Sequence, residues 1–334
     1  MTDLYGKRVL FVAPKYFGYE KYIEKALEQR GAEVITIVEN LDMVSMWYRL
    51  IYVYLPSFKE KLQYRYYYKK ISSMDGQFDY VLVIRGSSLT SETMRYIKKC
   101  INPKCTYLMY QWDGIQNNQD VLKIVDYFDK ISTFDVDDAE QMGWYYTPLF
   151  YINMLTKQRD GEKDIDILYI GSVHSSRIKI LKLIKSLAQN KKLNLYAHLF
   201  TPRLLYYKRK YLSQNTDYID ADPKDLKFES LSIKEVYELY GRSKIVIDFT
   251  HPHQTGFTMR TIECVGNKCK LITNNQYIKN ADFYNPKNIM VYGGTSIDIT
   301  EEFIKTEYEE NSTELQDRYS LDGWIDSIFG ENNV

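Results

Sequence analysis

The sequence predicts an α/β protein with two Rossmann-like, doubly wound domains that face a cleft. Its 334 residues are enough for two domains rather than one. In both halves, short apolar runs alternate with amphipathic segments, which is the pattern of β-α-β units and a parallel sheet. The polar stretch at 157–163, KQRDGEK, is a linker by composition. We therefore expect domains at 1–156 and 157–334, and the last helix either stays in the second domain or packs back on the first.

The first half opens with a β-α-β unit. Residues 7–13 (KRVLFVA) form an apolar run of strand length, and an amphipathic segment follows that ends at Gly31. Residues 33–38 (EVITIV) are the next strand, so the glycine stops the intervening helix. Three further strands are predicted in this half, at 80–84, 106–110 and 130–134.

The second half repeats the same plan after the linker. Its predicted elements, in order, are a strand at 165–170, a helix at 176–188, a strand at 193–200, a helix at 233–240, a strand at 244–249, a helix at 258–265 and a strand at 270–273. The alternation again favours a parallel sheet with helices on its faces.

Composition and charge exclude several classes of protein. Acidic and basic residues balance at 44 each, so the chain as a whole has no field that would attract nucleic acid. The first apolar run is only a strand long and lacks a cleavable site, and no run approaches the length that spans a bilayer. We expect a cytoplasmic protein. Its 32 tyrosines suit ligand clefts and interfaces where one end of the ring stays wet.

Four cysteines form two C-x4-C pairs: Cys100 with Cys105, and Cys264 with Cys269. This is not the spacing of a zinc knuckle, and no histidine is near either pair in the sequence. We expect buried free thiols.

The segment 46–71 interleaves aromatic residues with lysine and arginine. Two interpretations stay open: it lies in a membrane interface against anionic lipid, which would make the protein peripheral at the inner face of the membrane, or it is a helix that packs its tyrosines on the domain. Residues 203–212 (RLLYYKRKYL) have the same character.

Ligands of open parallel sheets bind beyond the carboxyl ends of the strands, which selects candidate residues directly. In the first half these are Tyr16, Gly18, Arg85, Trp112, Asp113 and Asp135. The first loop lacks the G-x-G-x-x-G spacing, so no nicotinamide or flavin dinucleotide is indicated. Asp113 is a candidate general base with Trp112 beside it, although a carboxylate that caps the next helix is an equally simple interpretation, more so for Asp135.

In the second half, the loop GSVHSSRIK offers Gly171, Ser172 and Arg177 at the start of a helix. Open backbone amides with a nearby guanidinium are suited to an anion, and a plain turn with a surface arginine is the alternative.

The stretch at 250–275 is the stronger candidate. Gly256 precedes a predicted helix start, where Thr258 would offer an unpaired amide. Arg260 in the first turn can bridge two phosphate oxygens, and Glu263, on the same helical face, can accept hydrogen bonds from sugar or ribose hydroxyls. The alternative is an Arg260–Glu263 surface pair. For His253 and His174 we expect hydrogen bonds toward substrate or loop packing rather than a metal site.

These residues resemble a known family. HQTGFTMRTIECVGNKCKLITNN is similar to the C-terminal signature of GT-B glycosyltransferases, most closely the CgeB-like and capsular or lipopolysaccharide biosynthesis branch, and DILYIGSVHSSR and LMYQWDGI resemble strand-ending segments of the same branch. The resemblance implies a nucleotide-sugar donor held by the second domain, an acceptor approached from the first, and catalysis without a metal or other cofactor. By position it gives Arg260 and Arg177 the diphosphate and Glu263 the ribose or sugar. Leu271, where many members have a second glutamate, loosens any inference about stereochemistry.

Three functions remain open at this point. The first is a glycosyltransferase that acts on a polysaccharide, lipid-linked or other glycan acceptor. The second is a nucleotide-sugar epimerase or hydrolase on the same scaffold, and the third a non-catalytic sugar- or nucleotide-binding module, because a fold does not fix a function.

Overall fold

The computed structural model describes residues 1–41, 48, 54, 58–156, 163–173, 177–212, 216–219, 221–250, 255–293, 297 and 299–330. The chain divides into two compact units, here called unit 1 (Met1–Phe150 with Leu321–Val334) and unit 2 (Tyr151–Ser320). The division thus falls after Phe150, close to the boundary expected from the sequence after residue 156. Among the described residues, no helix combines the length and the apolar character needed to cross a membrane.

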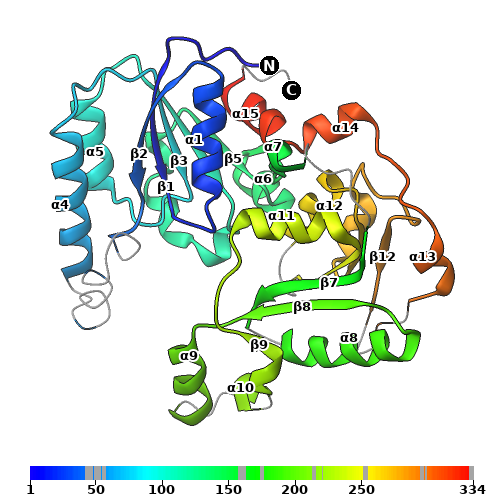
Figure 1. Ribbon diagram of the computed structural model, residues 1–334. Helices are drawn as coiled ribbons and strands as arrows, with labels where there is room; N and C mark the ends of the chain where they lie inside the picture. Colours follow the sequence, from blue (N-terminus) through cyan, green and yellow to red (C-terminus); the bar gives the residue numbers. More distant parts are fainter. Residues whose placement is uncertain are drawn as a thin grey trace. The chain divides into compact units, whose positions relative to one another are not determined.

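Unit 1 is built on a parallel sheet with the strand order β2-β1-β3-β4-β5-β6. Its strands are β1 (Arg8–Ala13), β2 (Glu33–Val38), β3 (Tyr80–Ile84), β4 (Thr106–Gln111), β5 (Lys130–Thr133) and β6 (Tyr145–Tyr146). Its helices are α1 (Tyr19–Gln29), α4 (Lys59–Ile71), α5 (Ser91–Cys100), α6 (Val136–Met142) and α15 (Leu321–Phe329), with short 3-10 turns η2 (Ile115–Asn117), η3 (Gln119–Lys123) and η4 (Val125–Tyr127). Figure 1 shows α1 on one face of the sheet and α4 and α5 on the other.

The C-terminal helix α15 is part of unit 1 because of what it buries. Trp324 is 1% exposed, and its ring lies 5.0 Å from that of Tyr110 in β4. The buried guanidinium of Arg30, at the end of α1, donates to Asp326 Oδ1 at 2.6 Å and to the Asp322 carbonyl at 2.7 Å. Apolar burial and a charge-assisted bond therefore fix α15 against α1 and β4.

Unit 2 has a second parallel sheet, with the order β12-β11-β10-β7-β8-β9. Its strands are β7 (Ile165–Ser172), β8 (Leu195–Phe200), β9 (Leu226–Lys227), β10 (Ser243–Asp248), β11 (Lys270–Thr273) and β12 (Ile289–Val291). Its helices are α7 (Asn153–Thr156), α8 (Arg177–Lys191), α9 (Arg203–Tyr207), α10 (Thr216–Ile219), α11 (Ile233–Arg242), α12 (Met259–Gly266), α13 (Glu301–Lys305) and α14 (Thr313–Arg318), with a π-helical turn η5 (Lys208–Leu212) and 3-10 turns η6 (Pro223–Asp225) and η7 (Gln276–Asn280). Helices α8 and α11 cover opposite faces of β7 and β8 (Figure 1).

The two parallel six-stranded sheets confirm the predicted fold class, an α/β protein with two Rossmann-like domains. In each unit the strand order reverses once, between β1 and β3 in unit 1 and between β7 and β10 in unit 2. At such a switch point neighbouring loops leave the sheet in opposite directions and open a crevice beyond the carboxyl ends of the strands. The two switch points are therefore where each unit can hold a ligand.

Helix α4 covers part of the segment 46–71, of which residues 48, 54 and 58–71 are described. It buries Gln63, Tyr67 and Ile71, and the rings of Tyr64 and Tyr68 pack against Tyr96 of α5 at 6.1 and 4.9 Å. In this part of the segment, tyrosines pack on the domain. Membrane contact through 46–71 stays a prediction.

All four cysteines are free thiols, and Cys105, Cys264 and Cys269 are buried. Burial raises the pKa of Cys105 to about 12, so this thiol stays protonated and unreactive at neutral pH.

Candidate functional site

A buried group of charged side chains lies at the switch point of unit 2. Asp248 ends β10 and is fully buried. Its carboxylate accepts hydrogen bonds from Arg260 Nη1 and, at 2.7 Å, from Thr258 Oγ1. Thr258 is the N-cap of α12, where its hydroxyl also accepts from the Thr261 amide at 3.2 Å, and this places Arg260 in the first turn as the sequence predicted. The cap and the carboxylate together fix the guanidinium beside the end of the strand.

Arg177 brings a second guanidinium to the same place. It begins α8, is 9% exposed, and donates from Nη1 to the Ser172 carbonyl at 3.2 Å. Burial, and next the repulsion from Arg260, lower the pKa of Arg177 to about 10. The attraction of Asp248 is weaker than that repulsion. Among the described residues, Arg177 is thus a buried cation whose charge is not fully balanced, which is unfavourable unless an anion binds.

Gly171 makes room for this arginine. A Cβ atom built on Gly171 would lie 2.6 Å from Nη1 of Arg177, closer than real contacts allow. The glycine predicted to open the backbone to a ligand therefore also lets the guanidinium lie flat against the end of β7.

Two tyrosines complete the surroundings of the charged group. Burial raises the pKa of Tyr169 to about 12, and its hydroxyl donates to the Arg177 carbonyl at 3.4 Å. Tyr292, which follows β12, is 9% exposed, and its buried hydroxyl has no hydrogen-bond partner among the described residues. Burial, followed by Tyr169 and Asp248, raises the pKa of Tyr292, so its hydroxyl keeps its proton at neutral pH.

The remaining residues predicted for the donor have mixed positions. Glu263 is 3% exposed and accepts a hydrogen bond from Tyr240 Oη at 2.9 Å. The alternative of an Arg260–Glu263 surface pair is therefore wrong, because Arg260 pairs with Asp248 instead. Gly256 is buried next to the start of α12. His174 and His253 lie outside the described residues, and their roles stay predictions.

Sequence reasoning missed Asp248. Asp248 follows the apolar run IVI at the end of β10. A buried carboxylate in that position needs a partner cation. That signal was visible in the sequence, but the identity of the partner was not, since Arg260 is twelve positions away along an intervening loop.

Unit 1 has its own polar group at its switch point. Arg85 follows β3 with a left-handed backbone, φ 71°, as does Gly86, so the two residues form a tight turn that projects the arginine. Its Nε lies 2.9 Å from Asp113 Oδ2, and its Nη1 donates to the hydroxyl of Tyr16. The Tyr16 ring is 5.7 Å from that of Trp112. The structure thus brings together four residues that follow three different strands: Tyr16 after β1, Arg85 after β3, and Trp112 and Asp113 after β4.

The two candidate carboxylates of unit 1 differ in environment. Burial raises the pKa of Asp113, and the attraction of Arg85 opposes that rise only in part. Asp135 caps α6 by accepting from the amides of Asp137 and Asp138 at 3.1 and 3.2 Å, which is the alternative weighed for it. Gly18 is the N-cap of α1 at φ 93°, a conformation that favours glycine. Asp135 thus has the capping role, and the role of Asp113 stays a prediction.

A polar cavity of about 620 Å³ opens beside this group in unit 1. Tyr16 and Arg85 line it, together with amide side chains: Asn40, Gln116, Asn117, Asn118 and Gln119. A second cavity of about 860 Å³ continues along α4 and shares Lys59, Ser87 and Asp120 with the first. Amide-rich walls next to aromatic rings are suited to a ligand with many hydroxyl groups.

Glu39 holds the turn that carries Arg85. It is fully buried beyond β2, and its Oε1 accepts from the Ser88 amide at 3.0 Å and from Ser87 Oγ at 3.1 Å. Burial raises the pKa of Glu39 to about 7. The Arg85 carbonyl is held in turn by Gln111 Nε2 at 2.8 Å. Sequence analysis assigned no role to Glu39.

No residue group of the described chain is arranged for a metal: there is no cluster of three or more His, Cys, Asp or Glu side chains among those residues. The cationic group of unit 2 is suited instead to an anion. The polar group of unit 1 is suited to a hydroxyl-rich ligand, and the carboxylate of Asp113 belongs to that group.

Comparison with known proteins shows the fold. No family model matches the chain, and no curated protein does. Among solved structures, the Anabaena protein HepE in complex with UDP-glucose has a TM-score of 0.60 at 11% identity, over 96% of this chain and 98% of that one. HepE in complex with UDP and glucose gives 0.58 at 11% identity, over 98% and 100%.

Two other structures are similar over nearly the whole chain. A glycosyltransferase from Rickettsia africae has a TM-score of 0.50 at 14% identity, over 97% of this chain and 89% of that one. The UDP-GlcNAc 2-epimerase of Methanocaldococcus jannaschii has 0.51 at 9% identity, over 95% and 98%. At these identities the likeness shows the fold alone: the chain has the two-domain, Rossmann-like fold of the GT-B glycosyltransferases.

Proposed function

We propose that the protein is a glycosyltransferase that moves a sugar from a nucleotide-diphosphate donor to a glycan acceptor. The observation that carries the proposal is Arg177, a buried guanidinium beside Arg260 at the switch point of unit 2. A diphosphate would supply the negative charge that this place lacks, and forked guanidinium donors match phosphate oxygens. The fold that this chain shares with HepE in complex with UDP-glucose supports the choice of donor.

The proposed reaction breaks the bond between the sugar C1 and the oxygen of the donor's terminal phosphate. Negative charge develops on the departing diphosphate, and Arg177 and Arg260 stabilise it without a metal ion. The acceptor hydroxyl forms the new bond to C1 and gives its proton to Asp113, whose raised pKa suits a general base. Nucleoside diphosphate, glycoside and a protonated Asp113 are the products of this step.

The polar cavity of unit 1 is the proposed acceptor site. Its amide side chains can donate to and accept from sugar hydroxyls, and the ring of Tyr16, which packs beside that of Trp112, can stack on a sugar face. We therefore propose a saccharide acceptor, free or at the end of a lipid-linked or polysaccharide chain. Membership of the CgeB-like, capsular or lipopolysaccharide branch is part of this proposal.

One observation favours a second candidate. The M. jannaschii UDP-GlcNAc 2-epimerase is about as similar in fold as the Rickettsia glycosyltransferase. An epimerase acts on one substrate, however, and would leave the polar cavity of unit 1 without a use. Transfer uses both switch points and is the better account.

The first experiment is nucleotide binding by thermal shift with UDP, GDP, CMP and dTDP. At least one of them should raise the melting temperature of the wild-type protein. Arg177→Gln is the better probe than a change at Arg260, which would leave the carboxylate of Asp248 buried without its cation. Arg242→Gln, at an exposed arginine paired with Asp164, is the matched control. If no nucleotide changes the melting temperature, both enzymatic accounts fail.

The second experiment separates transfer from the alternatives. Incubation with the donor whose nucleotide binds, with and without mixed saccharide acceptors, is followed by chromatography of the products. A new glycoside that requires acceptor indicates transfer, an isomeric nucleotide-sugar indicates epimerisation, and binding without turnover indicates a binding module. Asp113→Asn should keep nucleotide binding and lower transfer by about 10²–10⁴-fold. Transfer at the wild-type rate in that variant would remove Asp113 as the base, and loss of transfer in EDTA would contradict the metal-free mechanism.

A further inference from the structure

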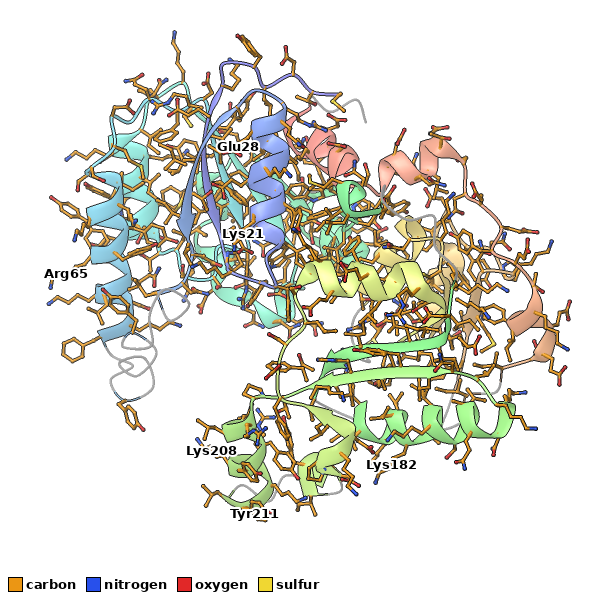
Figure 2. The ribbon with its side chains drawn as sticks, in the orientation of Figure 1. Lys21, Glu28, Arg65, Lys182, Lys208 and Tyr211 are labelled. Atoms are coloured by element: carbon orange, nitrogen blue, oxygen red, sulfur yellow. The ribbon has the colours of Figure 1, made fainter. Side chains whose placement is uncertain are left out.

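One helical segment of unit 2 turns an apolar face to solvent. Helix α9 runs directly into the π-helical turn η5, and together they span residues 203–212. Leu204 is 85% exposed, Leu212 80% and Tyr211 65%. Figure 1 shows α9 projecting beyond the edge of the unit 2 sheet at β9, and Figure 2 places Lys208 and Tyr211 on its outer part, away from the sheet. A surface helix of a globular protein normally turns polar side chains outward, so this face is unusual.

The exposed side chains share one face of the segment. Leu204 and Tyr207 are three positions apart and share one side of α9, and Tyr211 and Leu212 follow in the π-helical turn η5. The rings of Tyr207 and Tyr211 are stacked, 6.2 Å apart at 12°, which shows directly that they lie on the same side. Leu204, Tyr207 and Tyr211 therefore share one exposed side, and the exposed Leu212 directly follows Tyr211.

The opposite side of the segment is anchored in the core of unit 2. Tyr206 is 1% exposed, and its ring packs against Tyr218 at 6.3 Å and Phe228 at 5.8 Å. The segment is therefore a packed part of unit 2, and its outer face is exposed in the folded protein.

The same ten residues carry positive charge and no acidic residue. The basic residues are Arg203, Lys208, Arg209 and Lys210. Lys210 donates to the Tyr206 hydroxyl at 2.9 Å, and the Arg209 guanidinium lies 5.3 Å from the Tyr218 ring centre. These partners are neutral and orient the cations, and Asp222 attracts Lys210 less strongly than the hydrogen bond to Tyr206 does. The segment thus combines exposed leucine, exposed tyrosine and net positive charge on one surface.

We propose that residues 203–212 bind the surface of an anionic lipid bilayer. The leucine side chains enter the boundary between headgroups and acyl chains, the tyrosine rings lie at headgroup depth, and the lysine and arginine side chains reach the lipid phosphates. A protein partner fits this face less well, because interface cores are depleted in lysine, whereas Lys208 lies in the middle of the apolar face. The inference goes beyond the proposed transfer reaction and does not depend on it.

Co-sedimentation with vesicles tests the inference on the full chain. The wild-type protein should sediment with vesicles of phosphatidylcholine and phosphatidylglycerol at low salt, remain in solution with phosphatidylcholine alone, and be released by high salt. Lys208→Glu should lower the partition coefficient by roughly tenfold or more, since each basic residue contributes about 1 kcal/mol at an anionic surface. Leu204→Glu should have a comparable effect, and both positions are exposed, so neither change removes packing.

Two matched variants localise the effect. Lys21→Glu reverses an exposed charge on α1 of unit 1 and should leave vesicle binding unchanged, and Arg65→Glu does the same on α4, within the other aromatic and basic segment (Figure 2). The inference fails if the wild-type protein does not sediment with anionic vesicles at low salt. It also fails if Leu204→Glu and Lys208→Glu bind like wild type, or if Arg65→Glu alone abolishes binding. A dimer in sedimentation velocity that Leu204→Glu dissociates would show instead that this face joins two copies of the chain.

Discussion

Replacement of Arg177 by methionine is expected to make the protein more stable and its nucleotide binding weaker. In the folded chain, burial and then repulsion from Arg260 lower the pKa of Arg177 from 12.5 to about 10. One pKa unit corresponds to about 1.4 kcal/mol, so the charged form costs the fold roughly 3 kcal/mol at neutral pH. The folded state binds this proton less tightly than the unfolded chain does, so the cost is present below about pH 10 and is lost as the pH rises from there toward 12.5.

Methionine matches the apolar stem of arginine as far as Nε and lacks the charged end of the guanidinium. It removes this cost and loses one hydrogen bond to the Ser172 carbonyl, worth about 1 kcal/mol. The free energy of unfolding should therefore rise by roughly 2 kcal/mol, and the melting temperature by several degrees at about 2–4 °C per kcal/mol. Hydrogen bonds to charged groups contribute about 1.5–3 kcal/mol, so the dissociation constant for UDP should increase about 10- to 100-fold.

The assay is a thermal melt of both proteins with and without UDP, supported by titration calorimetry. Arg242→Met, at an exposed arginine paired with Asp164, is the control and should change neither quantity appreciably. An Arg177→Met protein that is less stable than wild type but shows the same shift with UDP would refute the reasoning, because Arg177 would then be a structural residue with no part in holding the anion.

Three further predictions follow from the buried groups. Gly171→Ala should weaken UDP binding in titration calorimetry with the fold retained, because the new Cβ would lie 2.6 Å from Nη1 of Arg177. The control is Gly114→Ala, whose new Cβ would have its nearest neighbour 3.7 Å away. Equal affinities of the two variants for UDP would contradict the expectation. Burial raises the pKa of Glu39 from 4.5 to about 7, so the folded state holds this proton more tightly and stability should fall by roughly 3 kcal/mol as the pH rises through that range. Glu39→Gln should remove this part of the pH dependence in denaturant unfolding, and an unchanged slope would show that another group causes it. Asp248→Asn should destabilise the protein by about 3–5 kcal/mol because it leaves a buried guanidinium without its carboxylate; a free energy of unfolding within about 1 kcal/mol of wild type would rule this pair out as a buried ion pair.

The fold could be predicted because its signals are local. Runs such as VLFVA in β1 and IVI in β10 are buried on both faces of a parallel sheet and read as continuous apolar stretches. The alternation with helices then gives the fold class, and the rule that ligands bind at strand ends selects residues without contact information. Tyr16, Arg85 and Asp113, which are separated by long stretches of sequence, meet at the switch point of unit 1 for this reason.

The parts that could not be predicted depend on contacts between distant residues. Helical spacing gave Glu263 as the neighbour of Arg260, but the side chain of Arg260 turns to Asp248, which the fold brings from the preceding strand. The closeness of Gly171 to the Arg177 guanidinium depends on how α8 leaves β7, and no pattern in the sequence encodes it. Glu39 was missed because its partners, Ser87 and Ser88, lie in the turn after a different strand.

The same limit applies to the aromatic and basic segments. Both 46–71 and 203–212 have the composition of an interfacial helix, and composition alone does not say which side chains face outward. In α4 the rings of Tyr64 and Tyr68 contact Tyr96 of α5, and Tyr68 is still 50% exposed; in α9 and η5 the rings of Tyr207 and Tyr211 contact each other. Two exposed leucines, Leu204 and Leu212, distinguish the segment 203–212 from α4.

A crystal structure of the protein with UDP would show whether Arg177 and Arg260 hold the diphosphate. We predict that the diphosphate lies at the carboxyl ends of β7 and β10, with its oxygens within hydrogen-bond distance of the guanidinium groups of Arg177 and Arg260. UDP bound at another place in the chain, with the Arg177 guanidinium still directed only at the Ser172 carbonyl, would contradict the account.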